Sequence, residues 1–427
     1  MTVFDLPRFF VLPFLFIFGS CIGSFLNVCI HRFPPKLRLR DQLRSLASHS
    51  SGCPRCSSAI LWRDNIPMLG WLLLGGRCRS CRRPISLRYP LVEFLTGCLF
   101  VLVYQAEMPP HFWSSAAETG LFSTEGPQNL TLHLPMPLWL HVRYALHMAM
   151  VCGLIAASFI DLELWIIPDG TTIPVMLLAM TTHTVCGQAW LLPVWFEDAS
   201  VAVLLQHIAP PALEPFFAPW NCLPFAVAHP HWHGFLVSLT GFVVGGGIVW
   251  SVRLLGEFVL KREAMGFGDV VLMAMVGSVL GWQPAVLIFF LAPMPAIAIG
   301  ILSVILRRRD EIPYGPWLSL ATLLLLLTWP HVWPQAERFF DMGKVLLLMA
   351  FPSALFLAAS LKISQLTKRL FGGAASPVLP EALDDGIPMI YPADRSDPLA
   401  GHWPRDLWPG IRSGQGLSAS YHWRSSR

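Results

Sequence analysis

The feature that most constrains this chain is a series of long apolar runs separated by short polar segments. The first run, roughly residues 9–30, carries no charged side chain. At about 1.5 Å of rise per helical residue, it is long enough to cross a hydrocarbon core of ~30 Å. Charged residues make up only 13% of the chain, whereas a soluble globular domain usually carries about 25%. The sequence therefore predicts an all-α polytopic membrane protein.

Eight or nine transmembrane helices are predicted from these runs. The apolar segments lie at about 9–30, 91–106, 144–160, 171–192, 234–255, 270–282, 284–306, 316–329 and 345–361. The first could belong to a cleavable signal peptide, but no small-residue cleavage site follows it, which favours a retained first transmembrane helix at 1–30. A transmembrane core is predicted at 91–362. Residues 363–427 are rich in Pro, Gly, Ser and Asp and are predicted to form a disordered tail.

The distribution of basic residues predicts the orientation. Residues 31–90 hold twelve Arg or Lys and two acidic residues, whereas residues 107–140 hold three Glu and no Lys or Arg. The positive-inside rule places the first stretch in the cytoplasm and the second outside. Counting spans alternately from there puts Asp161 and Asp269 on the cytoplasmic side. It puts a loop at about 193–233 outside.

Two aspartates are the candidate catalytic residues. Asp161 lies at the end of the third predicted span, and Asp269 lies in a Gly-Phe-Gly-Asp sequence at the start of the sixth. A carboxylate at a membrane boundary is costly unless it is hydrated, paired or neutralised, so such residues are functional candidates. Two carboxyl groups held together share one proton, as in an aspartic protease. Gly266 and Gly268 would let a substrate backbone or a neighbouring helix approach Asp269 closely.

The acidic residues could instead have structural roles. Asp269 could cap the start of a helix by accepting from unpaired amide groups. Asp161, just past a helix end, has no capping role and is disfavoured by the helix dipole. Asp169, in an Ile-Pro-Asp-Gly sequence, is interpreted as a turn residue or cap before the fourth span. Glu163 is interpreted as interfacial.

Four cysteines form a candidate metal site. Cys53 and Cys56 make one Cys-x-x-Cys pair, and Cys78 and Cys81 make a second one after 21 intervening residues. This spacing matches a tetrathiolate zinc site, which would be structural because four thiolates leave no open coordination position. Two disulfides or a redox pair are the alternatives, and cytoplasmic placement argues against disulfides. A small zinc-binding cytoplasmic domain is therefore predicted at 31–90.

Five motifs, in order along the chain, resemble those of bacterial type IV prepilin peptidases, which are Gly-x-Gly-Asp aspartic proteases. They are Gly23-Ser24-Phe25-Leu26-Asn27-Val28 with His31-Arg32-Phe33-Pro34, the tetracysteine block with Tyr89-Pro90-Leu91-Val92-Glu93, Asp161 through Pro168-Asp169, Gly266 to Asp269, and Ile312-Pro313-Tyr314-Gly315-Pro316. These motifs extend over most of residues 10–330.

The resemblance implies an enzyme with Asp161 and Asp269 as the catalytic pair and zinc on the four cysteines. Family members cut a short basic leader from type IV pilin-like precursors at the cytoplasmic face of the bacterial inner membrane, in type IV pilus assembly or protein secretion. Many then methylate the new N-terminus with S-adenosylmethionine. The expected partners are the precursor and the lipid bilayer, and no nucleic acid is expected. The first-span motif and Glu93 would help to form the substrate groove, and Asn27 and His31 are interpreted as packing or capping residues, with direct contact to the chemistry as the alternative.

The chain departs from the family pattern at two positions near the aspartates. Val271 stands where the family often has Lys, and Glu163 stands where Asp is common. No Gly-rich nucleotide fingerprint identifies an S-adenosylmethionine site, so substrate choice and methylation stay open. The alternatives are a peptidase without methyltransferase activity that acts on other single-span substrates, and a non-enzymatic membrane scaffold or transporter whose acidic residues line an ion path.

Overall fold

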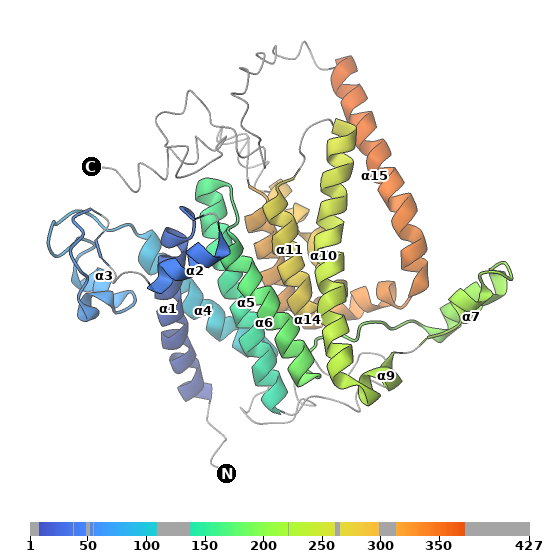
Figure 1. Ribbon diagram of the computed structural model, residues 1–427, viewed down its shortest axis with the longest axis horizontal. Helices are drawn as coiled ribbons and strands as arrows, with labels where there is room; N and C mark the ends of the chain where they lie inside the picture. Colours follow the sequence, from blue (N-terminus) through green and yellow to red (C-terminus); the bar gives the residue numbers. More distant parts are fainter. Residues whose placement is uncertain are drawn as a thin grey trace.

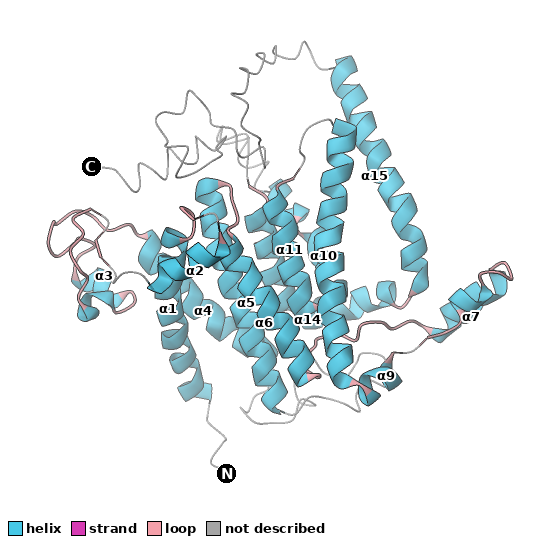
Figure 2. Ribbon diagram, in the orientation of Figure 1, coloured by secondary structure: helices cyan, strands magenta, loops and turns pink. Residues whose placement is uncertain are grey.

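The structure is a computed structural model, and it is helical throughout the part of the chain that it describes. The described residues are 8–36, 38–47, 52–53, 55–108, 137–220, 222–260, 265–298 and 313–371. In these ranges no strand forms, and the only β-type pairings are two isolated bridges in the tetracysteine region (Figure 2). The predicted all-α class is therefore confirmed for these ranges.

Five helices in the described ranges are long and apolar enough to cross a bilayer, and Figure 1 shows most of them running in similar directions. They are α1 (Arg8–Arg32), α4 (Arg88–Glu107), α5 (Pro137–Leu164), α10 (Pro230–Leu260) and α14 (Gly315–Phe340). Large apolar side chains such as Phe14, Phe25 and Phe258 stand exposed on them. Exposed apolar surface of this kind suits a lipid solvent. The chain is a multi-pass membrane protein.

The four other predicted spans are also helical but are not among these five. They correspond to α6 (Asp169–Cys186), α11 (Phe267–Leu280), α12 (Trp282–Leu291) and α15 (Lys344–Phe371). The total of eight or nine spans therefore stays a prediction. The predicted start of the tail, residue 363, falls inside α15, and residues 372–427 lie outside the described part of the chain.

Helix α11 lies at the centre of the bundle, where it contacts α5, α6, α10, α12 and α14. Nearly every residue from Asp269 to Leu280 is buried. Gly241 of α10 and Gly277 of α11 bring the two backbones into contact, since a Cβ on either would collide with the carbonyl group of the other. Small residues allow this close helix packing within membranes. The packing holds α11, and with it Asp269 in its first turn, in a fixed place.

Helices α1 and α4 form a second closely packed pair, which contacts the rest of the bundle through α5 and α14. At the far end of α5 from Asp161, the buried Glu107 carboxylate of α4 lies 2.7 Å from Nδ1 of His147 on α5. Arg143, one turn earlier on α5, donates to the carbonyl oxygen of Trp190 at 3.3 Å. The contact between Glu107 and His147 fixes α4 against α5.

The loop predicted at about 193–233 contains three short helices. They are α7 (Ala199–Ile208), α8 (Glu214–Phe217) and α9 (Leu223–Ala228). Lys344, the first residue of α15, reaches back to this loop, with its Nζ 3.2 Å from Oε1 of Glu197 and 2.6 Å from the carbonyl oxygen of Ala218. The loop is therefore attached to the start of α15.

The segment between α1 and α4 is largely irregular. It contains α2 (Leu39–Ala47), the 3₁₀ turn η1 (Trp62–Asn65) and the short helix α3 (Leu69–Leu73). Figure 1 shows the part around α3 standing to one side of α1 and α4 rather than above the bundle. This part carries the four cysteines.

Candidate active site

The two predicted catalytic aspartates meet inside the bundle. Asp161 lies in the last turn of α5 and Asp269 in the first turn of α11, and these two helices pack together. The side chains are almost fully buried, with 6% and 7% of their surface exposed, and the two carboxyl groups are close enough to repel each other electrostatically. The structure therefore brings together the pair that the sequence singled out, although the two residues are 108 positions apart in the chain.

Each carboxyl group accepts a hydrogen bond from the start of a helix. The N–H of Gly315, the first residue of α14, donates to Asp161, and the N–H of Gly266, the N-cap of α11, donates to Asp269. Asp269 thus makes the return bond of a capping box, so it has a structural role beside any catalytic one. The expectation that Asp161 caps nothing is wrong, because Asp161 satisfies an unpaired amide of α14.

These contacts suggest what stabilises negative charge in the pair. Within the described residues, neither carboxyl group takes part in an ion pair, and Val271, two positions after Asp269, carries no charge. The N-termini of α11 and α14 both lie against the pair. A helix N-terminus carries a partial positive charge and free N–H groups, which favour a nearby anion. Two helix ends can therefore replace a missing cation.

The side chain of Ile167 fills the space beside two motif glycines. A Cβ built on Gly268 would lie 3.1 Å from Cβ of Ile167, and one built on Gly315 would lie 3.2 Å from its Cδ1. The same Gly315 atom would lie only 2.6 Å from Oδ2 of Asp161. Ile167 therefore lies against both glycine-containing motifs, and a methyl group on either glycine would be in tight contact with its side chain. No pattern in the sequence identified this residue.

The turn from α5 to α6 is held at both ends. Trp165 ends α5 in a left-handed conformation (φ 60°), and its N–H donates to the carbonyl oxygen of Asp161 at 2.9 Å. At the far end, the buried Gln42 of α2 accepts from the N–H of Gly170 at 2.6 Å and donates to the carbonyl oxygen of Lys36 at 2.8 Å. Gln42 was also missed, because its partner is 128 positions away.

Asp169 and Glu163 lie beside the pair in other roles. Asp169 is partly buried in the first turn of α6, where the helix dipole favours a carboxylate. The N-cap of α6 is Pro168, so Asp169 is the first residue of the helix and not a cap or turn residue before it. Glu163 forms an ion pair with Arg88, the first residue of α4. That pair connects the start of α4 to the last turn of α5, two residues beyond Asp161.

Asn27 and Glu93 connect the helices to the cysteine-bearing segment. Asn27 Nδ2 donates to the carbonyl oxygen of Tyr89 at 3.0 Å, which joins α1 to α4. Glu93 Oε2 accepts from the N–H of Met68 at 2.7 Å, which joins α4 to the residue before α3. The contact of Asn27 agrees with its interpretation as a packing residue, whereas the expected place of Glu93 in the substrate groove stays a prediction.

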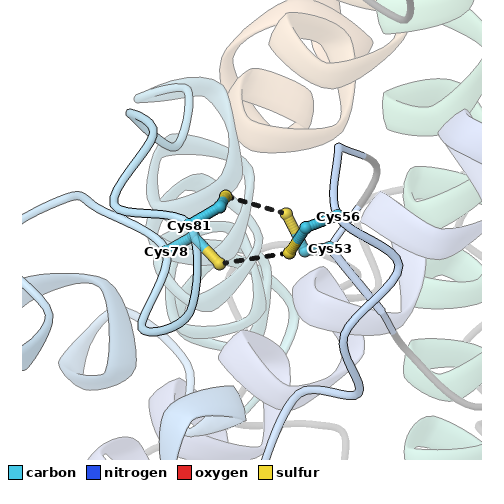
Figure 3. A group of neighbouring side chains, drawn as sticks. All are labelled: Cys53, Cys56, Cys78 and Cys81. Carbon is cyan, nitrogen blue, oxygen red and sulfur yellow. Dashed lines mark hydrogen bonds between the residues drawn. The ribbon is translucent and has the colours of Figure 1, made fainter.

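The four cysteines come from two turns of the same shape. In each turn the first cysteine donates its N–H to the carbonyl oxygen five residues later, Cys53 to Ser58 and Cys78 to Arg83, each at 2.9 Å. In each turn the residue after the second cysteine has a positive φ. Figure 3 shows the two turns presenting their sulfur atoms to each other. Similar local sequences therefore fold alike and face one another.

The sulfur atoms fit a tetrahedral metal ion. All four lie within 4.8 Å of one another. Two pairs between the turns are separated by 3.9 Å (Cys53 to Cys81) and 4.0 Å (Cys56 to Cys78). A tetrahedron with metal–sulfur bonds of about 2.3 Å requires sulfur atoms ~3.8 Å apart. A disulfide requires a separation of about 2.05 Å, and all four thiols are free. The cluster could therefore bind a metal.

Hydrogen bonds also favour the thiolate form of two of these cysteines, Cys56 and Cys78. The hydroxyl group of Ser58, 3.0 Å from the Cys56 sulfur, lowers the pKa of that thiol to about 6. The backbone N–H of Cys81 lowers the pKa of the Cys78 thiol. Thiolates are the form that binds metal ions. Arg79 also holds Asp64 through two hydrogen bonds of 2.7 and 2.6 Å, which connects the second turn to η1.

Comparison with known proteins agrees with this arrangement. Residues 17–106 match the Bacterial Peptidase A24 N-terminal domain, and residues 215–302 match the Type IV leader peptidase family. The four cysteines fall in the first match and Asp269 in the second, while Asp161 lies between the two. No solved structure matches the chain.

Three similar proteins illustrate the relationship. A Prepilin leader peptidase/N-methyltransferase of Aeromonas salmonicida is 29% identical over 73% of this chain and 89% of its own length. A protein of the same name from Myxococcus xanthus is 31% identical over 72% of this chain and 69% of its own. The Type 4 prepilin-like proteins leader peptide-processing enzyme of Escherichia coli O78:H11 is 31% identical over 71% and 88%. Since this similarity extends over most of both chains, the protein belongs to the type IV leader peptidase family.

Proposed function

We propose that this protein is an aspartic endopeptidase that removes the leader from type IV pilin-like precursors at the cytoplasmic face of the bacterial inner membrane. The observation that carries the proposal is the buried pair of Asp161 and Asp269, brought together by α5 and α11. The names of the similar proteins supply the substrate class. The excess of basic residues at 31–90 supports the cytoplasmic face.

The chemistry follows from a pair that shares one proton. The ionised carboxylate takes a proton from a water molecule as its oxygen attacks the scissile carbonyl carbon, while the protonated carboxyl group donates a hydrogen bond to the carbonyl oxygen. When the C–N bond breaks, a carboxyl group gives a proton to the leaving amine. The hydrogen bonds from Gly266 and Gly315 would hold the two carboxyl groups in place during both steps.

Cleavage can be tested with the full chain in bacterial membranes that contain a co-expressed pilin-like precursor. We expect the precursor to lose its leader only when the chain is present, and the mature protein to begin at one defined residue by mass spectrometry. Intact precursor in every tested pairing would contradict the peptidase function. Intact precursor is the result expected for a non-enzymatic scaffold or transporter.

We further propose that the new N-terminus is methylated with S-adenosylmethionine. The support is the second half of the relatives' printed names. Mass spectrometry of the mature N-terminal peptide is expected to show one methyl group when S-adenosylmethionine is supplied and none without it. A processed but unmethylated N-terminus in both conditions would show a peptidase without methyltransferase activity.

Zinc is the metal that we propose for the tetracysteine cluster, since tetrahedral thiolate coordination without an open position is typical of structural zinc. The full chain is expected to purify with one zinc ion. Loss of a residue that only supports a metal ligand typically weakens metal binding by roughly 10- to 100-fold. Cys56→Ser or Cys81→Ser removes a ligand itself, so either is expected to weaken zinc binding by more than that. Cys21→Ser, which changes an exposed free thiol of α1, is the matched control. Equal zinc content by elemental analysis in the wild type and in the three Cys→Ser variants would contradict the assignment.

A further inference from the structure

The cysteine-bearing segment exposes an unusual amount of apolar surface. Trp62 is 82% exposed and Leu73 is 80% exposed. The set, which we call the apolar face, consists of Ile60, Leu61, Trp62, Ile66, Leu69, Leu72, Leu73 and Leu87. These residues lie outside the membrane-spanning helices, so the lipid core does not account for their exposure. Exposed apolar residues gathered in one short segment indicate an interaction surface.

The local structure holds this face outward. In α3 the indole of Trp71 turns inward, donates to the carbonyl oxygen of Ile85 at 3.1 Å and packs against Gly76, while Leu72 and Leu73 point away. The two hydrogen bonds from Arg79 to Asp64 fix η1, which leaves the adjacent Trp62 exposed. The apolar face is therefore presented by ordered contacts.

The same segment also carries exposed basic side chains. Arg63, Arg77 and Arg82 are all exposed. The one acidic residue between the first cysteine and α4, Asp64, is already paired with Arg79. A surface that combines exposed tryptophan and leucine with arginine is suited to the boundary of a membrane with anionic lipid headgroups. A protein partner would have to be acidic to match this excess of positive charge.

The position of the segment agrees with a lipid surface. It follows the C-terminal end of α1 and precedes the N-terminal end of α4, and in Figure 1 it extends sideways beside these two spans. The hydrogen bond from Met68 to Glu93 holds the start of α3 against α4, five positions inside that helix. That offset corresponds to about 7.5 Å along the helix axis. The segment is thus held near the level where α1 and α4 leave the hydrocarbon.

From these observations we propose that the cysteine-bearing segment lies on the membrane surface, with its apolar face inserted among anionic lipid headgroups beside α1 and α4. Tryptophan is favoured at this depth because its ring is apolar and its N–H is polar. The proposal rests on the multi-pass fold and on the exposed residues. It does not depend on the proposed peptidase activity, so it can fail or succeed separately.

The test uses the full chain, one copy in each lipid nanodisc, with a photo-crosslinking amino acid in place of Trp62, Leu73 or Ser80. Ser80 is an exposed polar residue of the second cysteine turn and serves as the control. Mass spectrometry is expected to find lipid adducts several-fold more often at positions 62 and 73 than at 80, and more often in phosphatidylglycerol than in phosphatidylcholine. Equal yields at the three positions would overturn the proposal.

A second measurement needs no substitution, so it cannot fail through misfolding. Hydrogen exchange of the amides in α3 is expected to be several-fold slower in phosphatidylglycerol discs than in phosphatidylcholine discs, while exchange in the cysteine turns stays unchanged. Identical exchange in both lipids would contradict lipid docking. In native membranes, crosslinks from position 62 or 73 to the precursor or to a second copy, in place of lipid, would show that the apolar face is a protein interface.

Discussion

Replacement of either Asp161 or Asp269 by asparagine is expected to abolish precursor cleavage. Asparagine has nearly the same shape and its oxygen can still accept from Gly315 or Gly266, so the fold should persist. It cannot accept or release a proton in the reaction. General acid–base catalysis by one group typically contributes about 10²- to 10⁴-fold, and here the pair must supply both the base and the acid. We therefore expect a loss of at least about 10³-fold.

The double variant provides a sharper test than either single one. Groups that act as a unit give strongly non-additive losses. The Asp161→Asn/Asp269→Asn protein is thus expected to be no slower than the single variants. Additive losses would indicate two independent contributions and contradict the shared-proton mechanism. The readout is the rate at which the precursor is shortened in membranes that contain equal amounts of each protein.

Asp169→Asn is the matched control, since Asp169 is an aspartate in the first turn of α6, the helix that follows α5. It is expected to keep most of the activity, with a small loss from the weaker interaction with the helix dipole. Full activity in Asp161→Asn or Asp269→Asn would exclude that residue from catalysis. An inactive Asp169→Asn protein that is correctly folded would move the assignment toward Asp169.

The elements that could be predicted from the sequence are those that depend on local pattern. Each of the nine predicted apolar segments overlaps a helix, because a long apolar run in lipid must satisfy its backbone groups internally. The fourth segment, 171–192, extends past the end of α6 at Cys186. The four cysteines cluster as predicted, because the repeated turn sequence brings each pair into the same local geometry. Asp161 and Asp269 also lie close together, as a shared function would require.

The elements that could not be predicted depend on contacts between distant residues. The hydrogen bond from Gly170 to Gln42 joins residues 128 positions apart, and no periodic pattern in α2 identifies that glutamine. Likewise, nothing local to Asp161 indicates that the first amide of α14 will meet it, which is why its capping role was missed. The positions of Ile167, Gly268 and Gly315 are set by how α5, α11 and α14 pack, and periodicity within one helix carries no information about this packing.

The second large effect is expected from the three glycines near the aspartates, which should differ in how well they tolerate alanine. A methyl group on Gly266 would have its nearest neighbour 3.7 Å away, an ordinary contact. On Gly268 it would meet Ile167 at 3.1 Å, and on Gly315 it would meet the Asp161 carboxylate at 2.6 Å. We therefore expect cleavage to be nearly unchanged in Gly266→Ala, reduced in Gly268→Ala and most reduced in Gly315→Ala.

The loss in Gly315→Ala is expected to reach about 10²-fold, the cost typical of a displacement of ~1 Å at a reacting group. It should appear in the rate of cleavage and not in the yield of folded protein, because alanine is a better helix former than glycine. The measurement compares processing rates in membranes with equal protein content. A Gly315→Ala protein as active as the wild type would show that the Asp161 carboxyl group can occupy another position in catalysis.

Substitution of Ile167 separates the two crowded glycines. Ile167→Ala removes Cγ1 and Cδ1, which are two of the three atoms that a methyl group on Gly268 would meet. It should therefore restore part of the activity of Gly268→Ala. It should not restore Gly315→Ala, because the closest atom there belongs to Asp161. Rescue of both variants would mean that Ile167 alone limits the space in the site. Rescue of neither would mean that Gly268 is required for a reason other than its contact with Ile167, such as close approach of the substrate backbone to Asp269.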